Sequence, residues 1–190
     1  MSDKPPPAGM QRFYREDLDQ HGVRATQRFE ASELIMAYGA VRWLPGPNRM
    51  TLQVSAHLHF ELDPPLLESI NHGCDPNVYF DVDRSELRTL RAIEAGEELT
   101  AFYPTSEWDM QSPFTCNCGT ARCHGQIRGS KHLPAEVMAT YRTSAFVTAQ
   151  LAEAAAARAM DEAQVDGGLG LTAQGHAEYA RGEASQAAPV

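Results

Sequence analysis

Four cysteines limit what this chain can fold into more than any other feature of its sequence. Cys116, Cys118 and Cys123 lie in one short segment, and Cys74 lies far upstream of it. Three clustered thiolates leave one position open on a tetrahedral zinc ion, and Cys74 is the only other cysteine that could fill it. Such a site ties a late loop to the middle of the chain. With four sulfur ligands it has no open position, so the zinc would be structural.

Two other interpretations of the cysteines stay open, namely buried free thiols and two disulfides. The segment Met1–Met10 lacks the apolar core of a signal peptide, and no apolar run approaches the ~18 residues of a membrane span. We therefore expect an intracellular, cytoplasmic protein whose thiols are reduced, which favours a metal site. His72 and His124 adjoin cysteines, but sequence neighbours usually point apart, so neither is expected to be a ligand.

The charge balance excludes one class of partner and suits another. Acidic residues outnumber basic residues by 25 to 16, which gives a formal net charge of −9. A nucleic-acid binder needs a basic face for phosphate contacts, so we expect no direct nucleic-acid partner. An acidic protein suits a cationic partner such as a lysine-rich peptide.

Composition divides the chain into three sections. Residues 1–11 contain three consecutive prolines and are predicted to be a disordered arm. Residues 12–133 contain every strand-like segment and all four cysteines. Residues 134–190 are rich in alanine and predict a helical extension that ends in a flexible tail. For the protein as a whole we expect no membrane partner. We expect the helical part, 134–163, to pack on the protein or to join a homodimer, and glycines near 167 to end it.

Apolar and polar residues alternate between Met50 and Leu62, which is typical of strands with one buried face. The run is long for one strand, so we expect a turn near Ser55. His57 and His59 lie on the polar face of this pattern, and we expect both to face solvent. A further hairpin is predicted over residues 78–93, so the fold is expected to be mainly β with added helices.

Three motifs occur in the order found in one known family. They are Asn71-His72-Gly73-Cys74-Asp75-Pro76-Asn77, Gly96-Glu97-Glu98-Leu99-Thr100-Ala101-Phe102-Tyr103, and Cys116-x-Cys118-Gly119 followed by Cys123 and Gly125. The chain therefore resembles SET-domain protein-lysine methyltransferases that carry a post-SET segment. The resemblance implies a SET-type β-clip of small curved sheets with a pseudoknot and a helical C-terminal extension. It places the SET domain at residues 12–111 and the zinc-binding post-SET segment at 112–133.

The resemblance also implies an activity, the transfer of a methyl group from S-adenosylmethionine (AdoMet) to a lysine of a protein or peptide. It places Tyr103 and Tyr38 at the reaction centre and a structural Zn²⁺ on the four cysteines. The residues implied to bind or cover the cofactor are Gly22, Val23, Arg24, Asn71, His72, Tyr103, Trp108 and Phe114. Phe80 and Phe102 are expected to be walls of the lysine channel. Without the motif, a tyrosine at a strand end would be a half-buried core residue.

Departures from the family pattern leave two alternatives. Gln20 stands where the family has the first glycine of a G-x-G segment, and Glu68-Ser69 replaces an Arg-Phe pair. These departures suit a SET-fold binding or scaffold module that does not methylate. A second alternative keeps AdoMet but methylates a small-molecule amine.

Overall fold

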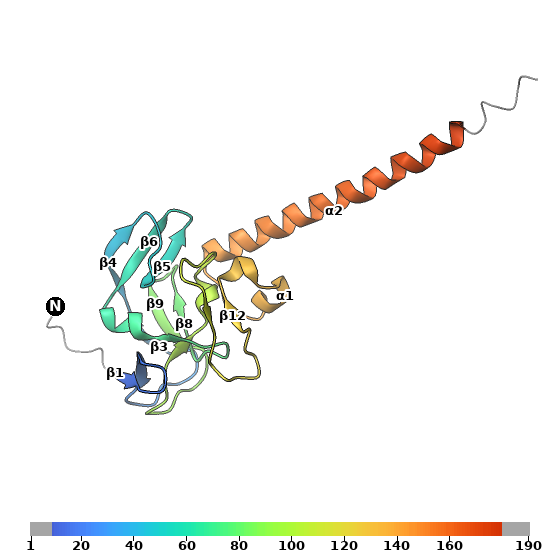
Figure 1. Ribbon diagram of the computed structural model, residues 1–190. Helices are drawn as coiled ribbons and strands as arrows, with labels where there is room; N and C mark the ends of the chain where they lie inside the picture. Colours follow the sequence, from blue (N-terminus) through green and yellow to red (C-terminus); the bar gives the residue numbers. More distant parts are fainter. Residues whose placement is uncertain (1–8, 180–190) are drawn as a thin grey trace, which may run out of the picture. The chain divides into compact units, whose positions relative to one another are not determined.

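Figure 1 shows the protein as a computed structural model, which describes residues 9–179. Small sheets make up most of it, and helices occur mainly near the C-terminal end. The strands are β1 (Met10–Arg15), β2 (Gln20–Ala25), β3 (Leu34–Ala37), β4 (Gly39–Leu44), β5 (Thr51–Ser55), β6 (Leu58–Asp63), β7 (Asn71–His72), β8 (Val78–Asp81), β9 (Glu86–Thr89), β10 (Thr100–Ala101), β11 (Phe114–Thr115) and β12 (Gln126–Ile127). The helices are η1 (Pro65–Ser69), η2 (Tyr103–Thr105), η3 (Ser130–His132), α1 (Ala135–Met138) and α2 (Ala145–Tyr179). The expected mainly β fold of small sheets is confirmed.

The first hairpin begins inside the range predicted to be a disordered arm. β1 starts at Met10 and pairs antiparallel with β2, and the Met10 side chain is only 3% exposed. Burial of this methionine against the core explains why ordered structure starts earlier than the proline run suggested. Residues 1–8 of the predicted arm lie outside the described residues.

The alternating segment forms the predicted hairpin, with the turn after Ser55. β5 and β6 pair antiparallel, and β4 lies on the other side of β6. The expectation for His59 is wrong, because its side chain is 2% exposed, whereas His57 does face solvent. The polar face is covered there by a later segment, since the Trp108 backbone N–H donates to Gln53, the cross-strand partner of His59.

β8 and β9 form the second predicted hairpin, and β3 pairs with β9 to make a three-stranded sheet.

The pairing of β7 with β10 is shorter. β7 and β10 lie side by side in parallel, so that Asn71 is opposite Thr100 and His72 is opposite Ala101. Asn77 supports this contact, because its buried side chain accepts the Thr100 N–H and donates to the Glu98 carbonyl. This pairing brings two of the sequence motifs together.

The buried side chains form two hydrophobic clusters. The larger lies among the strands from β1 to β10 and includes Val23, Phe29, Leu67, Val78, Leu87, Ile93 and Leu99. The smaller cluster lies around the cysteines and contains Cys74, Phe102, Cys116, Ile127, Met138 and Val147. Its last two members come from α1 and α2, so the start of the alanine-rich section belongs to the second core.

The helical section differs from its prediction at both ends. A helix was expected from Pro134, but α1 ends at Met138 and α2 starts only at Ala145. The break allows residues between the helices to bond elsewhere, and the Ser144 N–H donates to the Thr105 carbonyl. Glycine was expected to end the helix, but α2 runs through residues 167–170, since glycine raises the free energy of a helix by about 1 kcal/mol without forbidding it.

The chain divides into two compact units after Leu151. The first unit contains all the sheets, α1 and the first turns of α2, so residues 134–151 are part of the folded body rather than an extension. The predicted tail at residues 180–190 lies outside the described residues. In the described part of the chain, no helix has the length and apolar character needed to cross a bilayer.

A substitution in the second hydrophobic cluster tests whether the first turns of α2 belong to the first compact unit. Val147→Ala removes two methyl groups from a fully buried position in α2 and should lower the free energy of unfolding by about 2 kcal/mol. Met160→Ala is the control, because Met160 lies in the same helix but is 65% exposed. It should change stability by less than ~0.5 kcal/mol. Chemical denaturation followed by circular dichroism measures both, and equal effects would contradict the division.

Candidate active site and metal centre

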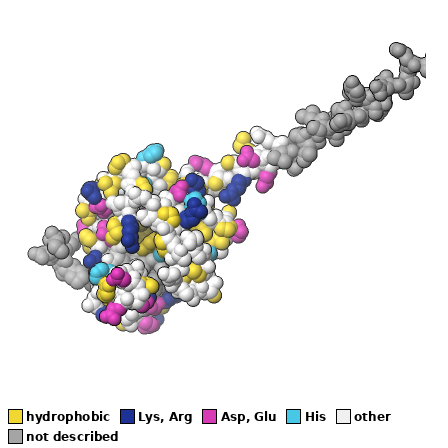
Figure 2. Space-filling view, viewed as in Figure 1, with side chains coloured by type: hydrophobic (Ala, Val, Ile, Leu, Met, Phe, Trp, Pro, Cys, Tyr) yellow, Lys and Arg dark blue, Asp and Glu magenta, His cyan; other side chains and the backbone are white. Residues whose placement is uncertain are grey.

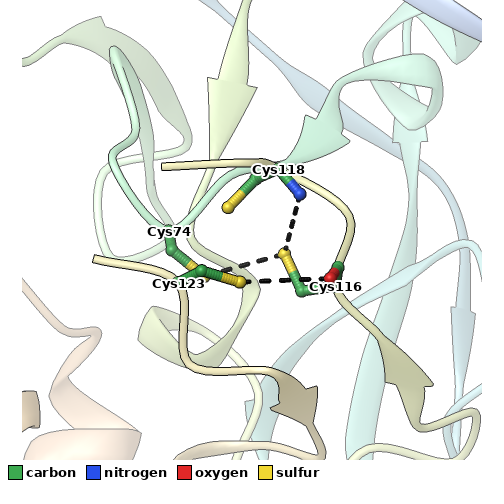
Figure 3. A group of neighbouring side chains, drawn as sticks. All are labelled: Cys74, Cys116, Cys118 and Cys123. Carbon is green, nitrogen blue, oxygen red and sulfur yellow. Dashed lines mark hydrogen bonds between the residues drawn. The ribbon is translucent and has the colours of Figure 1, made fainter. Parts of the chain in front are cut away.

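The four cysteine side chains converge on one point, as Figure 3 shows. Their Sγ atoms all lie within 4.8 Å of one another, and those of Cys74 and Cys116 are 3.7 Å apart. A zinc ion with Zn–S bonds near 2.3 Å needs sulfur atoms about 3.8 Å apart, so the spacing fits. All four are free thiols in this structure. The cluster could hold a metal ion.

Local backbone structure shapes the cysteine loop. β11 and β12 pair antiparallel and close the loop, and the Cys116 N–H donates to the Gly125 carbonyl at 2.7 Å. Gly119 and Gly125 have φ values of 68° and 70°, a region that favours glycine. The loop can therefore turn sharply enough to bring Cys118 and Cys123 back towards Cys116.

Burial raises the pKa of the Cys74 and Cys116 thiols, whereas hydrogen bonds from backbone N–H groups lower it. The backbone N–H of His124 donates to Cys74 Sγ, and that of Cys118 donates to Cys116 Sγ, both at 3.4 Å. Burial nevertheless raises the pKa of Cys74 to about 11. The thiol is therefore protonated unless a cation lies beside it, and metal binding would release that proton.

His72 joins the cysteine cluster to Tyr103. Its Nδ1 atom accepts the Tyr103 backbone N–H at 3.4 Å, so the ring hydrogen is on Nε2, which lies 3.3 Å from Cys74 Sγ. Burial lowers the pKa of His72 to about 4, so the ring is neutral. The rings of Phe102, Tyr103 and Phe114 surround it, with centroids 5.3 to 5.4 Å away.

Tyr103 begins η2, and Phe102 separates it from the end of β10. Its hydroxyl group donates a hydrogen bond to the Ile70 carbonyl at 2.8 Å. Burial raises the pKa of Tyr103 to about 12, so the side chain is a neutral phenol. This hydroxyl and the Ile70 carbonyl form a polar point in otherwise aromatic surroundings, beside the Asn71-His72 strand.

Asn71 and Gly22 meet at the carboxylate of Glu98. The Asn71 side-chain amide donates to Glu98 Oε1 at 2.9 Å and to the His21 carbonyl at 3.0 Å. A Cβ atom on Gly22 would lie 2.8 Å from the same Glu98 oxygen, so a larger residue would push this contact apart. Arg15 pairs with the other oxygen of Glu98 at 3.0 Å. No spacing rule in the sequence points to the contact of Glu98 with Asn71.

The other residues of the glycine segment point elsewhere. The Val23 side chain is fully buried in the main core, so a ligand could meet only its backbone. Arg24 is exposed and bonds to Gln11 at 3.1 Å. Trp108 is half-buried, and its backbone N–H donates to Gln53. The structure therefore brings together Gly22, Asn71, His72, Tyr103 and Phe114. The side chains of Val23 and Arg24 point away from this group.

Tyr38 lies in the main core. Its ring packs against Phe60 and Phe80, with centroids 6.1 and 5.8 Å away, and its hydroxyl donates to the Asp81 carbonyl. Burial and nearby carboxylates raise its pKa. Among the ring contacts and hydrogen bonds of the described residues, none joins Tyr38 to Tyr103. Phe80 shares this core with Tyr38, whereas Phe102 lies in the second core.

A cavity of about 260 Å³ lies between the β8–β9 turn and the link that precedes α2. Its lining runs over residues 79–84 and 142–144 and includes the ion pair of Arg142 with the buried Asp81 carboxylate. Tyr103, Asn71 and His72 do not line it. The cavity is therefore separate from the cluster of predicted site residues.

Residues 20–104 match the family model of the SET domain. These residues carry the two paired motifs and Tyr103. This part of the chain is a SET domain. The matched SET domain lies inside the predicted range 12–111, and residues from 105 onward, including three of the four cysteines, lie beyond it.

Several curated proteins are similar to this SET domain and its surroundings. Methyltransferase flvH of Aspergillus flavus is 39% identical over 102 residues, which cover 52% of this chain and 57% of that protein. Histone-lysine N-methyltransferase ash1 of Drosophila melanogaster is 38% identical over 76 residues, 35% of this chain and 3% of that protein. Histone-lysine N-methyltransferase SMYD3 of Mus musculus is 36% identical over 78 residues, 36% of this chain and 18% of that protein. The chain thus spans little more than half the length of flvH and a much smaller part of the other two relatives.

Glu107 is a buried carboxyl group that the sequence analysis did not identify, since no motif contains it. Its side chain accepts the Gln53 backbone N–H at 3.0 Å, and its own N–H donates to the Tyr103 carbonyl. Burial raises its pKa to about 8, so the folded protein holds this group protonated at neutral pH. Glu107 thereby links the β5–β6 hairpin to the segment that follows Tyr103.

This raised pKa predicts a pH dependence of stability. Between about pH 4.5 and pH 8, the unfolded chain releases the Glu107 proton and the folded protein keeps it. The folded state binds more protons, so wild-type stability should fall as pH rises through this window. Glu107→Gln keeps the acceptor oxygen for Gln53 but cannot ionise, so it should lose this part of the decline.

Denaturation midpoints at pH 5 and pH 8 measure the effect, with Glu136→Gln as the exposed control. The prediction fails if the Glu107 variant and the control show the same pH dependence as the wild type.

Proposed function

We propose that this chain, which contains a SET domain, is an AdoMet-dependent methyltransferase that acts on the side-chain amine of a lysine. The observation that carries the proposal is the parallel pairing of β7 with β10. It puts Asn71 and His72 beside the strand that leads into Tyr103, and the matched family domain covers all three residues. The named methyltransferases among the relatives support the same activity.

AdoMet would supply a methyl group on a sulfonium cation, and the residues beside the paired motifs suit a cationic ligand. Glu98 offers a partly exposed carboxylate next to Gly22 and Asn71, and it also acts electrostatically on Tyr103. Gly22 and Asn71 would hold the ligand, with Phe114 and Trp108 as covering side chains. Val23 and Arg24 would take part through their backbone.

The acceptor amine must lose a proton before it can attack a methyl group. Deprotonating a lysine at pH 7 costs roughly 4 to 5 kcal/mol when its pKa is ~10.4. Burial among aromatic side chains favours the neutral amine and lowers that cost. The Tyr103 phenol is neutral, so its role would be to orient the amine with its hydroxyl rather than to remove the proton.

A lysine-containing protein or peptide is the proposed substrate. The relatives named as histone-lysine methyltransferases support a protein acceptor, and the net charge of −9 suits a cationic peptide. Acidic and basic side chains both occur on the face shown in Figure 2, so that face carries no single sign of charge. The name of methyltransferase flvH states no acceptor, which leaves a small-molecule amine open as the second candidate. A homodimer through the alanine-rich helix stays a prediction of the sequence.

The metal of the cysteine cluster is proposed to be a structural Zn²⁺. Four sulfur ligands at this spacing suit zinc and leave no coordination position for a substrate. The ion would hold the loop of residues 116–123 against Cys74, next to His72. The role of the zinc ion would be structural, because it would keep the residues of the site in fixed positions.

Tyr103→Phe tests the proposed reaction centre. The variant keeps the ring contacts with His72 and Phe114 but loses the hydroxyl group, so turnover should fall by about 100-fold. AdoMet affinity, measured by calorimetric titration, should change little. Methyl transfer from labelled cofactor to lysine-rich peptides and to small amines measures the turnover and separates the two acceptor classes.

Two outcomes of these assays would contradict the proposal. Wild-type turnover in the Tyr103 variant would remove this residue from the mechanism. A folded wild-type protein that fails to bind AdoMet would favour a non-catalytic binding module instead.

Cys74→Ser tests the metal site. Serine is a poor zinc ligand, so the variant should lose most of its bound zinc and melt at a lower temperature. Metal content by mass spectrometry and thermal unfolding measure both effects, and wild-type protein treated with a chelator is the control. Full zinc occupancy in the variant would refute a four-cysteine site.

A further inference from the structure

Tyr141 lies in the link between α1 and α2, beyond the SET domain and beyond the cysteine loop. It packs in the second hydrophobic cluster, against Cys74 and Phe102. Neither the sequence motifs nor the family match assigns it a role. Its contacts nevertheless reach both the metal cluster and Phe102, the residue directly before Tyr103.

The Tyr141 hydroxyl group fixes the backbone of a metal ligand. It donates to the Cys74 carbonyl at 2.7 Å, and a carbonyl can only accept, so the phenol proton is committed to this bond. His124 Nε2, 3.1 Å from the same hydroxyl, must then carry a hydrogen and donate to the phenol oxygen. Because the His124 backbone N–H also donates to Cys74 Sγ, the two residues hold the carbonyl and the sulfur of Cys74 together.

The Tyr141 ring holds the segment before Tyr103. It stacks on Phe102 with a centroid distance of 4.1 Å and an interplanar angle of 19°. Phe102 is 1% exposed and is directly bonded to Tyr103 along the chain, so a shift of its ring would move the Tyr103 backbone. The Arg122 guanidinium lies 5.0 Å from the Tyr141 centroid and adds a cation–π contact.

The residues on either side of Tyr141 are anchored to the body. Arg142 pairs with the buried carboxylate of Asp81 at 3.1 Å. The Ser144 N–H donates to the carbonyl of Thr105, two residues after Tyr103, at 2.9 Å. The link is therefore held at several points, and the position of the Tyr141 ring does not depend on α1 alone.

We propose that Tyr141 is a positioning residue that couples the metal cluster to Tyr103. Its hydroxyl group, with His124, holds the Cys74 loop in the geometry that binds the metal. Its ring holds Phe102 and thereby the Tyr103 segment. The first half rests on the proposed zinc site, and the second half rests also on the proposed methyl transfer.

Zinc release tests the first half and needs no methyl transfer. Tyr141→Phe keeps the ring but loses both hydroxyl bonds, so zinc loss to a chromogenic chelator should be about tenfold faster than in the wild type. Tyr14→Phe is the matched control, because Tyr14 is an exposed tyrosine whose hydroxyl bonds to Asp19 in the first hairpin. It should release zinc at the wild-type rate. A wild-type rate in the Tyr141 variant overturns this half.

Turnover tests the second half, with zinc present in excess so that the metal site stays filled. Tyr141→Leu removes the stacking partner of Phe102, so kcat should fall about tenfold while the acceptor KM and the AdoMet affinity change little. Tyr141→Phe restores the ring and should recover most of the kcat. A wild-type kcat in the leucine variant, or an equal loss in both variants, overturns the role of the ring.

The two measurements separate failure of this inference from failure of the proposed function. A wild-type protein that binds zinc but transfers no methyl group would refute the proposed activity, while zinc release would still decide the role of the hydroxyl. If the leucine variant does not fold, zinc release from the phenylalanine variant still decides it.

Discussion

The parallel pairing of β7 with β10 is the contact on which the rest of the site depends. It joins only two residues from each strand, and parallel pairs this short are weak by themselves. The buried Asn77 side chain adds hydrogen bonds to the Thr100 N–H and the Glu98 carbonyl, and Gly73 leaves room for the Thr100 side chain. A short pairing can hold the site only because side chains from both motifs reinforce it.

Burial keeps the ionisable groups around this pairing neutral. His72 has a pKa of about 4, Tyr103 of about 12 and Glu107 of about 8, and burial is the main cause of each shift. A site that disfavours charge on its own groups would also disfavour the protonated form of an amine brought into it. Glu98 is different, because it is partly exposed and pairs with Arg15.

The sequence predicted the parts of the site that depend on short motifs. The cysteines form one cluster, and the β5–β6 and β8–β9 hairpins lie where alternation and turn residues indicated. Contacts between distant segments could not be predicted from patterns of this kind. His59 was expected to face solvent because the alternation of apolar and polar residues describes only its own pair of strands. It carries no information on the later segment that covers this face. For the same reason, Glu107 gave no signal, since its burial depends on Gln53, far away in the sequence.

The contacts of Tyr141 also could not be predicted from the sequence, because they join segments that are far apart in the chain. They show that residues beyond the SET domain complete the site. Alanine-rich sequence before and after the link suggested one continuous helix, yet the residues of the break hold the carbonyls of Cys74 and Thr105. The family match ends at residue 104, but Glu107, Phe114, three cysteines and Tyr141 all come from later residues. These later residues cover the buried side of Phe102 and Tyr103, which would otherwise expose aromatic surface to water. The SET domain therefore supplies the paired strands of the site, and the segment from residue 105 to Leu151 supplies the packing on Phe102 and Tyr103.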